Sequence, residues 1–362
     1  MTKKKRILGI DVARSIAIMG MIIVNFKVVL GEQDAGAGLK WFAHLFDGKA
    51  AATFVVLAGV GIALLSNSAI AQSDKTRIAG IKKSLFKRAL VLFFLGLSYM
   101  PIWPADILHF YGIYMLLTLL LLQASEKALF RTIILLVLGF PLLTHFIPYE
   151  QSWNFATFTY ADFWTVKGFF RNLFYNGFHP VIPWAAFMLY GLWLGRRNWY
   201  DEKVVRRAMR YSLVVFIGVQ FLSWSLIESF SIGLSGEDLA IISIFFGTNP
   251  MPPMPLYMVN GISIATFIIA FCVWISPRFE EAGWFQALAK TGRLALTFYV
   301  GHVILGMGGA LEGFGAKEGS YTLAFSLGYA VVFSLSCVLF AVIWSRYFKQ
   351  GPLEWCMRKL TS

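Results

Sequence analysis

Charged residues are scarce in this sequence: Asp, Glu, Lys and Arg make up 14% of its 362 residues, whereas hydrophobic residues make up 58%. This composition excludes a water-soluble domain of this length, because such a domain needs far more polar surface. Long polar segments are also missing, and no stretch outside the apolar runs is long enough to bury a core of its own. We therefore expect residues 1–362 to form a single transmembrane domain whose surroundings are the lipid bilayer.

Cysteine and histidine are also rare. Two of the three cysteines, Cys272 and Cys337, lie in apolar runs, and Cys356 lies in the C-terminal tail. This spacing predicts neither a disulfide framework nor a cysteine metal site. The histidines are scattered along the chain, and a catalytic zinc usually takes three protein ligands, so we expect no metal site.

Ten apolar runs have the length of membrane spans. They cover residues 8–30, 51–71, 85–102, 106–123, 128–147, 180–195, 208–230, 254–276, 292–311 and 321–346. Basic residues concentrate in every second link, which the positive-inside rule assigns to the cytoplasm, and this pattern accounts for the net charge of +13 without a nucleic-acid partner. The prediction is an all-α polytopic membrane helix bundle of about ten transmembrane helices in the cytoplasmic membrane, with both termini cytoplasmic.

Two charged residues occur near the start of the first span. Arg14 follows Asp11 by three residues, so the two side chains share a helix face and can neutralise each other. The alternative is that Arg14 binds a phosphate group from the cytoplasm, together with Lys87, Arg88 and Arg293 on the same side of the membrane. A cluster of this kind suits the phosphates of a nucleotide cofactor.

Other polar side chains occur at the opposite ends of spans. Asn25, near the far end of the first span, either bonds to a neighbouring helix or donates to a developing oxyanion. His44 precedes Asp47 by three residues in the following link. We interpret His44 as a general base for acyl transfer, acting with Asn25 and oriented by Asp47. Asp106 and His109 repeat this spacing and predict a second acid/base couple, or a group that positions the first.

A histidine also lies deep in the ninth span. Tyr299 and His302 fall on one face of this span, and the helical rise places His302 near the middle of the membrane. A hydrogen bond to Tyr299 alone would satisfy His302. The functional interpretation, which we adopt, is that both side chains line a cofactor site, because ionisable groups at this depth usually have a function.

The outer link at residues 148–178 is crowded with aromatic residues. One interpretation is an interfacial helix whose rings form an aromatic belt at the level of the lipid headgroups. The other is that the rings stack on a sugar or lipid acceptor.

Several of these stretches together carry a resemblance to a known family. They are Arg6–Arg14 leading to Val24-Asn25-Phe26, Asp47-Gly48-Lys49, Asp106-Ile107-Leu108, Gly292–Tyr299, and Gly351–Trp355 with Arg358. Over nearly the whole chain they resemble YeiB-type bacterial membrane proteins. More distantly, the chain is similar to heparan-alpha-glucosaminide N-acetyltransferase, a multi-span enzyme that moves acetyl from cytosolic acetyl-CoA to an amino sugar across the membrane.

The resemblance implies a transmembrane acyltransferase. Its donor substrate would be acetyl-CoA or another acyl-CoA, and its acceptor an envelope glycan or small molecule with an extracytoplasmic hydroxyl or amine. The catalytic roles of an asparagine and a histidine in the similar enzyme would fall to Asn25 and His44. A homodimer is compatible with this function. The alternatives are a transporter or exporter that uses the buried polar groups as a solute or proton path, and an envelope protein without turnover.

Overall fold

The computed structural model describes residues 6–155, 157–313 and 315–361. The described chain is mostly helical, with two short strands, and divides into two compact units. Unit 1 comprises the chain up to Phe54, Trp199–Arg210 and Ala265–Lys359; unit 2 comprises Val55–Asn198, Tyr211–Ile264 and the residues from Leu360. Three helices contribute to both units: α3 (Lys49–Ala71), α9 (Glu202–Phe230) and α11 (Pro255–Phe279).

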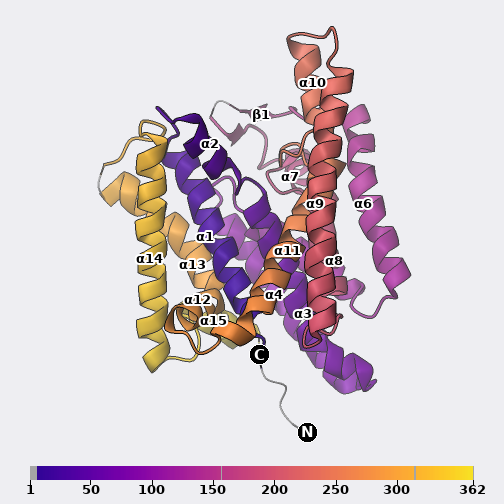
Figure 1. Ribbon diagram of the computed structural model, residues 1–362, viewed down its shortest axis with the longest axis vertical. Coiled ribbons are helices and arrows are strands. Elements are labelled where there is room, and N and C mark those ends of the chain that lie inside the picture. The colour runs from indigo at the N-terminus through magenta and orange to yellow at the C-terminus, as the bar shows by residue number, and fades with distance from the viewer. Residues whose placement is uncertain (1–5, 156, 314, 362) are drawn as a thin grey trace. The chain divides into compact units, whose positions relative to one another are not determined.

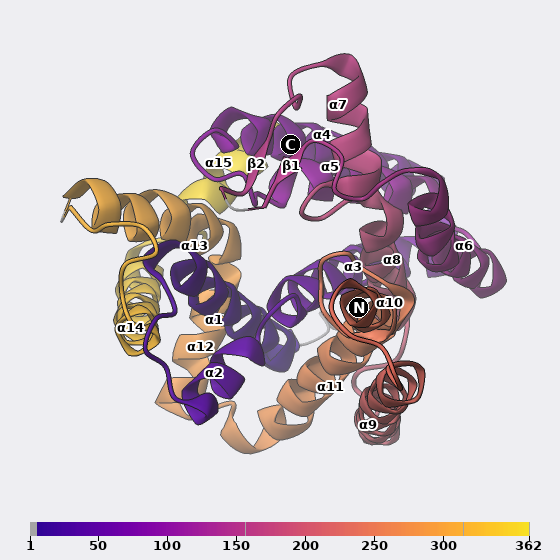
Figure 2. The same ribbon diagram turned by 90° about the horizontal axis from the view of Figure 1, so that it is seen from above.

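Helix α1 (Leu8–Leu30) organises unit 1. It packs against α12 (Gly283–Arg293), α13 (Ala295–Gly301) and α14 (Leu323–Tyr347), and the short helix α2 (Ala37–His44) contacts both α1 and α14. Figures 1 and 2 both show α14 beside α1 and α2. The other elements of unit 1 are the π-helices η2 (His302–Met307) and η3 (Gly309–Gly313) and the C-terminal helix α15 (Pro352–Thr361).

Unit 2 is built on packed contacts among four helices. Helix α5 (Leu108–Leu120) packs against α4 (Lys75–Tyr99) and α8 (Val181–Leu194), and α6 (Glu126–Phe146) packs against α8. The remaining elements are β1 (Trp153–Asn154), β2 (Thr159–Tyr160), α7 (Val166–Arg171), the π-helix η1 (Asn172–Asn176) and α10 (Glu237–Phe246). Strands β1 and β2 are antiparallel, with Trp153 opposite Tyr160.

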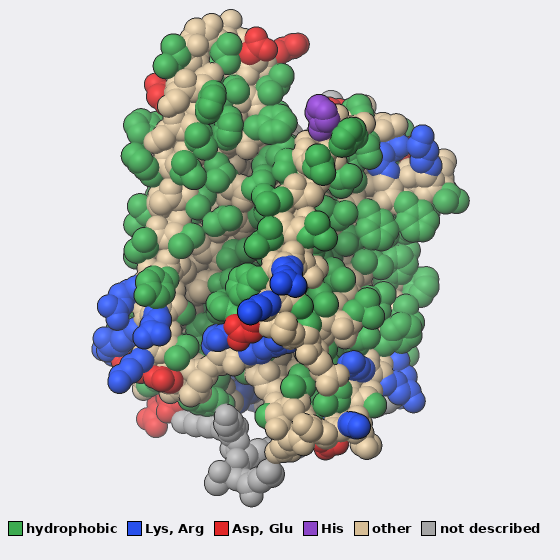
Figure 3. Space-filling view, turned by 90° about the vertical axis from the view of Figure 1, so that its right-hand side faces the viewer, with side chains coloured by type: hydrophobic (Ala, Val, Ile, Leu, Met, Phe, Trp, Pro, Cys, Tyr) green, Lys and Arg blue, Asp and Glu red, His purple; other side chains and the backbone are tan. Residues whose placement is uncertain are grey.

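The helices are long and apolar enough to cross a membrane. Among the described residues, seven candidate spans combine sufficient length and hydropathy, and α5 and α8 are shorter apolar helices. On α6, hydrophobic side chains such as Leu135 and Leu138 are 72% and 58% exposed, as expected for a helix that faces lipid. Figure 3 shows a face with many hydrophobic side chains, on which most of the Lys and Arg side chains lie in the lower half. The protein is therefore an all-α polytopic membrane protein, as the sequence predicts.

The helix ends follow from local capping. Asp74 begins α4 by accepting a hydrogen bond from the backbone N–H of Arg77, and Ser125 begins α6 in the same way. Thr322 caps α14. Such side chains satisfy N–H groups that have no partner within their own helix. The predicted span at 85–102 overlaps α4, which begins earlier, at Lys75, and ends at Tyr99; the last basic residue of α4 is Arg88.

Two glycines of α8 permit close contact with α3 inside unit 2. The spacing of Gly191 and Gly195 predicts close helix packing. The structure confirms it, because a Cβ at Gly191 would lie 2.1 Å from the carbonyl oxygen of Val56, and one at Gly195 would lie 2.8 Å from the Cα of Val60.

Gly191→Ala is expected to lower the free energy of unfolding by about 1–3 kcal/mol, because the added methyl group must push backbone atoms apart. The matched control is Gly139→Ala in α6, where a Cβ meets open space. This control should be neutral or stabilising by up to about 1 kcal/mol, since alanine favours helix. Melting temperatures of both variants in detergent measure the difference; equal melting temperatures would contradict the close packing.

Candidate functional site

Three arginines surround one buried carboxylate at the first turn of α1. Asp11 is 2% exposed, and its Oδ1 lies 2.8 Å from Arg14 Nη1 and 2.9 Å from Arg6 Nη2. Arg293 Nε lies 3.6 Å from Asp11 Oδ2. We call Arg6, Arg14 and Arg293 the arginine cluster. Three guanidinium groups against one carboxylate leave an excess of positive charge, which is suited to binding an anion.

A close helix contact brings Arg293 to this cluster. Gly292 precedes it at the end of α12, and a Cβ at Gly292 would lie only 1.8 Å from the carbonyl oxygen of Asp11. Only a glycine lets α12 approach α1 this closely. The predicted pairing of Arg14 with Asp11 is confirmed, while Arg6 was not foreseen. Lys87 and Arg88 lie on α4 in unit 2, and their role at a cofactor stays a prediction.

The carboxylate of Glu354, in the C-terminal helix α15, stabilises the helix break that follows Arg293. The chain leaves helical geometry at Leu294, and α13 begins at the next residue. Glu354 Oε1 accepts hydrogen bonds from the backbone N–H groups of Leu296 and Thr297, at 2.7 and 3.1 Å. A negative charge at a helix N-terminus is favourable. The tail therefore fixes the start of α13, which leads directly into His302, the first residue of η2.

Asn25 pairs with His302, across 277 residues of sequence. Asn25 Nδ2 lies 2.8 Å from His302 Nε2. The other ring nitrogen, Nδ1, lies 3.3 Å from the carbonyl oxygen of Phe298, so Nδ1–H donates to that carbonyl and Nε2 accepts from the amide. One N–H of the Asn25 amide is used in this pair, and the second has no acceptor among the residues that the structure describes. The alternative that Tyr299 alone satisfies His302 is wrong, because Asn25 and the Phe298 carbonyl are partners of this imidazole.

Tyr299 makes ring contacts beside the same pair. Its ring stacks on Phe54 at 6.1 Å and meets the His302 imidazole edge-on at 5.4 Å. The residue is 2% exposed. Tyr299 therefore forms part of the wall around His302, and its contact with a cofactor stays a prediction.

His44 belongs to a second polar group in unit 1. Its Nδ1 lies 2.6 Å from Asp47 Oδ2, as the spacing of three residues predicts. Lys27 Nζ lies 2.9 Å from both oxygens of Asp47 and 3.1 Å from His44 Nδ1. The ammonium group donates to the carboxylate. In the tautomer in which His44 Nδ1–H also donates to Asp47, the lone pair is on Nε2, 3.5 Å from Glu32 Oε2; in the other tautomer, Nδ1 accepts from Lys27 and Nε2 carries the proton.

The structure gives Asn25 and His44 different hydrogen-bond partners. Asn25 and Lys27 are two residues apart on α1, so their side chains point to different sides of the helix. The amide turns to His302, whereas Lys27 turns to His44 and Asp47. The outer end of α1 therefore carries two neighbouring polar groups instead of one.

Lys27 was not singled out from the sequence, although a signal was present. Its side chain is only 4% exposed and lies in an apolar run, at the end that the charge pattern assigns to the outer face. A basic residue there departs from the positive-inside pattern, and it needs a partner within the protein. Asp47 is that partner.

Asp106 and His109 meet in unit 2, as their spacing predicts. His109 Nδ1 lies 2.9 Å from Asp106 Oδ2, and both residues are almost fully buried. The carboxylate also accepts from the Tyr99 hydroxyl at 2.7 Å and from the backbone N–H of Leu108 at 2.9 Å. Their contact is confirmed, while their role in catalysis stays a prediction.

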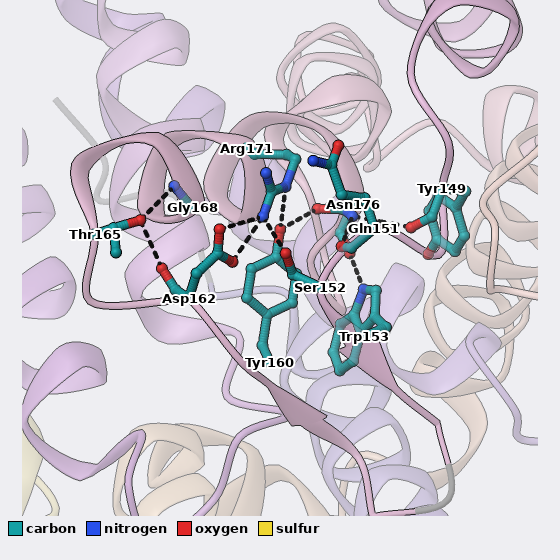
Figure 4. A network of polar contacts seen from close by, with 10 residues as sticks. All are labelled: Tyr149, Gln151, Ser152, Trp153, Tyr160, Asp162, Thr165, Gly168, Arg171 and Asn176. Carbon is teal, nitrogen blue, oxygen red and sulfur yellow. Dashed lines mark hydrogen bonds and ion pairs between the residues drawn. The ribbon is translucent and has the colours of Figure 1, made fainter.

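The aromatic outer link is a folded segment. In place of one interfacial helix it forms the β1–β2 hairpin, α7 and η1. Figure 4 shows Arg171 binding Asp162, Ser152 and the hydroxyl of Tyr160. The hydrogen bonds that Arg171 donates to Asp162 lower the pKa of this carboxyl group. The contacts of Arg171 hold the link in its folded form. In the same link, the Phe163 ring lies edge-on to the His109 imidazole, at 6.4 Å.

A second set of contacts in Figure 4 fastens η1 to the start of the link. The side-chain nitrogen of Asn176, Nδ2, donates to the backbone carbonyl oxygens of Tyr149 and Gln151, both at 2.9 Å. Trp153 Nε1–H donates to the backbone carbonyl oxygen of Asn176. The rings of Trp153 and Phe155 stack at 5.5 Å. Some of these rings therefore pack on one another, whereas Trp164 and Phe170 are 72% and 52% exposed.

These features define a class: a polytopic α-helical membrane protein whose first helix carries an arginine cluster at one end and hydrogen-bonded histidines at the other. Residues 6–228 match the family model "Heparan-alpha-glucosaminide N-acetyltransferase, catalytic", and the chain belongs to this family. Residues 194–362 match the model "Protein of unknown function (DUF418)".

The chain is also similar to a curated bacterial protein. It is 25% identical over 399 residues to "Uncharacterized protein YeiB" of Escherichia coli (strain K12), and the match covers 99% of this chain and 96% of that protein. Together with the two family matches, this confirms a YeiB-type family that is distantly related to heparan-alpha-glucosaminide N-acetyltransferase. The family is acetyltransferase-like.

Proposed function

We propose that this protein is a transmembrane acyltransferase of the cytoplasmic membrane. It moves an acetyl or other acyl group from cytosolic acyl-CoA to an extracytoplasmic hydroxyl or amine, on a cell-envelope glycan or a small molecule such as an amino sugar. The match of residues 6–228 to a catalytic acetyltransferase model supports the reaction class.

The observation that carries the proposal is that α1 has one polar group near each of its two ends. Asp11, at the centre of the arginine cluster, and Asn25 are fourteen residues apart on this helix, which corresponds to about 21 Å at 1.5 Å per residue. Acyl-CoA also has two reactive or charged ends, because its pantetheine arm separates the phosphates from the thioester. The arginine cluster then binds the phosphates, and the thioester extends toward Asn25.

The transfer step follows from the atoms at the outer end of α1. His44 Nε2 takes the proton from the acceptor O–H or N–H, while Asp47 holds Nδ1–H and Lys27 neutralises Asp47. The acceptor atom bonds to the carbonyl carbon of the thioester. The second N–H of Asn25 stabilises the resulting oxyanion. The carbon–sulfur bond then breaks, and the CoA thiolate takes up the proton.

A transporter is the second candidate, because the structure contains a broken helix at Leu294 and the π-helices η2 and η3. Transporters use the N-terminus of a broken helix to bind an anionic substrate. Here Glu354 already occupies the first N–H groups of α13. This contact favours the enzyme over a transporter with an anion site at that break.

Acetyl-CoA is expected to raise the melting temperature of the purified protein. Ligand at about one hundred times its Kd adds about 2.7 kcal/mol to the free energy of unfolding. Arg14→Gln and Arg293→Gln should each weaken binding about tenfold or more, since a hydrogen bond to a charged group contributes about 1.5–3 kcal/mol.

The matched control is Arg346→Gln, which removes an exposed arginine of α14 outside the arginine cluster and should leave the acetyl-CoA shift intact. Absence of a shift in the wild type counts against acyl-CoA as donor. An unchanged shift in both cluster variants counts against the arginine cluster as its binding site.

A further inference from the structure

The short helix α2 carries large hydrophobic side chains that the described part of the protein leaves uncovered. Trp41 is 68% exposed, Phe42 is 45% exposed, and Leu45, the residue directly after the helix, is 40% exposed. The opposite side of α2 packs inward, because Ala43 is fully buried in a hydrophobic cluster with residues of α14. We call Trp41, Phe42 and Leu45 the apolar face of α2.

Helix α2 lies at the outer end of the membrane-crossing part of unit 1. The 23 residues of α1 span about 35 Å at 1.5 Å per residue, slightly more than the hydrocarbon core of about 30 Å. The end of α1 therefore reaches the level of the lipid headgroups. Helix α2 contacts both α1 and α14, and Figure 1 shows it beside the upper ends of these two helices.

The occupant of the apolar face follows from its surroundings. The two helices that α2 contacts also expose hydrophobic side chains near their outer ends, Val28 on α1 at 45% and Phe325 on α14 at 47%. Lys40 is exposed on another side of α2. A helix with an apolar side rich in aromatic residues and a basic polar side lies in the plane of the membrane interface. The apolar face of α2 is therefore covered by the outer leaflet of the bilayer.

The proposed catalytic base lies at the border of the apolar face. His44 follows Trp41 by three residues, so the two side chains are neighbours on the helix surface. The side chain of His44 is 49% exposed. An acceptor that reaches this imidazole therefore approaches it at the level of the lipid headgroups, next to exposed hydrophobic side chains.

We propose that the acceptor is an amphiphile anchored in the outer leaflet, and that the apolar face of α2 binds its apolar part beside His44. This inference rests on the proposed function and specifies its acceptor. The oxygen or nitrogen of the headgroup bonds to the acyl carbon as the carbon–sulfur bond breaks, and its proton passes through His44 to the CoA thiolate. The apolar part stays in the leaflet, which keeps the headgroup close to His44.

The immersion of α2 can be measured without acyl transfer. Full-length protein with Trp41→Cys and Cys356→Ser is labelled at position 41 with a fluorophore, in phosphatidylcholine nanodiscs; Cys272 and Cys337 are buried and should not react. Spin labels on the lipid acyl chains should quench most of this fluorescence, and dissolved cobalt(II) should not. The control Lys40→Cys, about 100° away around the helix, should respond in the opposite way.

Two outcomes of this measurement overturn the proposal. Equal quenching by cobalt at positions 40 and 41 would show that water covers the apolar face. Quenching by neither agent at position 41 would show that protein covers it, for example a second copy of this chain.

The acceptor is tested with methyl and dodecyl glucosaminide, which have the same amine and different apolar parts. Wild-type protein in nanodiscs with labelled acetyl-CoA should have a higher kcat/KM for the dodecyl probe, through a lower KM. The double variant Trp41→Gln, Leu45→Gln should lose about tenfold or more of this preference, because two hydrophobic contacts are removed. The matched control Trp164→Gln, Val166→Gln, at exposed residues of unit 2, should keep the preference.

The outcomes separate this inference from the proposed function. Transfer to both probes with equal kcat/KM overturns the amphiphilic acceptor and leaves the proposed function intact. The same holds if the preference is equal in the α2 double variant and the wild type, or falls equally in the control, because adsorption of the dodecyl chain to the bilayer would then explain it. Transfer to neither probe contradicts the proposed function itself, and the acceptor with it.

Discussion

His44→Ala is expected to lower the rate of acyl transfer about 10²- to 10⁴-fold, the usual contribution of a general base. The reason is the orientation of the imidazole: in the tautomer in which Nδ1–H donates to Asp47, whose charge Lys27 balances, Nε2 carries the lone pair that accepts the proton. The effect should appear in kcat, because His44 is distant in sequence and fold from the arginine cluster that we assign to the phosphates. The measurement is acceptor acetylation from labelled acetyl-CoA.

The matched control for this variant is His145→Ala. His145 is exposed at the end of α6 in unit 2, and none of the proposed steps involves it. The control should transfer at the wild-type rate. If His44→Ala also acetylates its acceptor at that rate, His44 is not the base. A fall in the acetyl-CoA melting shift along with the rate would indicate general misfolding.

Asn25→Leu is expected to lower kcat about 10²- to 10³-fold, the cost of removing one oxyanion donor. The substitution is close in volume, so it removes the amide without opening a large cavity. It also removes the partner of His302, and the protein should melt at a somewhat lower temperature. The shift in melting temperature with acetyl-CoA should remain, since the arginine cluster is untouched.

Asn67→Ala provides the control for the loss of stability. Asn67 also makes one amide hydrogen bond, at 2.9 Å to the carbonyl of Gly195 in unit 2. This variant should lose comparable stability while its transfer rate stays at the wild-type value. Equal kcat values for Asn25→Leu and the wild type would exclude the oxyanion role and leave Asn25 as a structural partner of His302.

The parts of the site that are local in sequence could be predicted. Asp11 with Arg14, His44 with Asp47, and Asp106 with His109 are each separated by three residues, and in all three pairs the side chains meet. A spacing of three places two side chains on one side of a helix or turn. The all-α fold was predictable for a similar reason, since long apolar runs allow only helices to cross a membrane in a chain of this pattern.

The long-range parts could not be predicted in this way. The pair of Asn25 and His302 depends on how α1 packs against α13 and η2, and no local pattern specifies it. The same holds for Glu354 at the start of α13 and for Arg293 at Asp11. Gly292 shows why: the contact with α1 depends on the absence of a single Cβ, which becomes informative only once the two helices are known to be neighbours.

Transfer across a sealed membrane tests the central claim most directly. The protein is reconstituted in vesicles, labelled acetyl-CoA is supplied on the side of the arginine cluster, and glucosamine is enclosed on the other side as acceptor. The account predicts labelled N-acetylglucosamine inside wild-type vesicles and little in His44→Ala vesicles. Labelled product at equal rates in both, or entry of intact acetyl-CoA without any transfer to the acceptor, would contradict it.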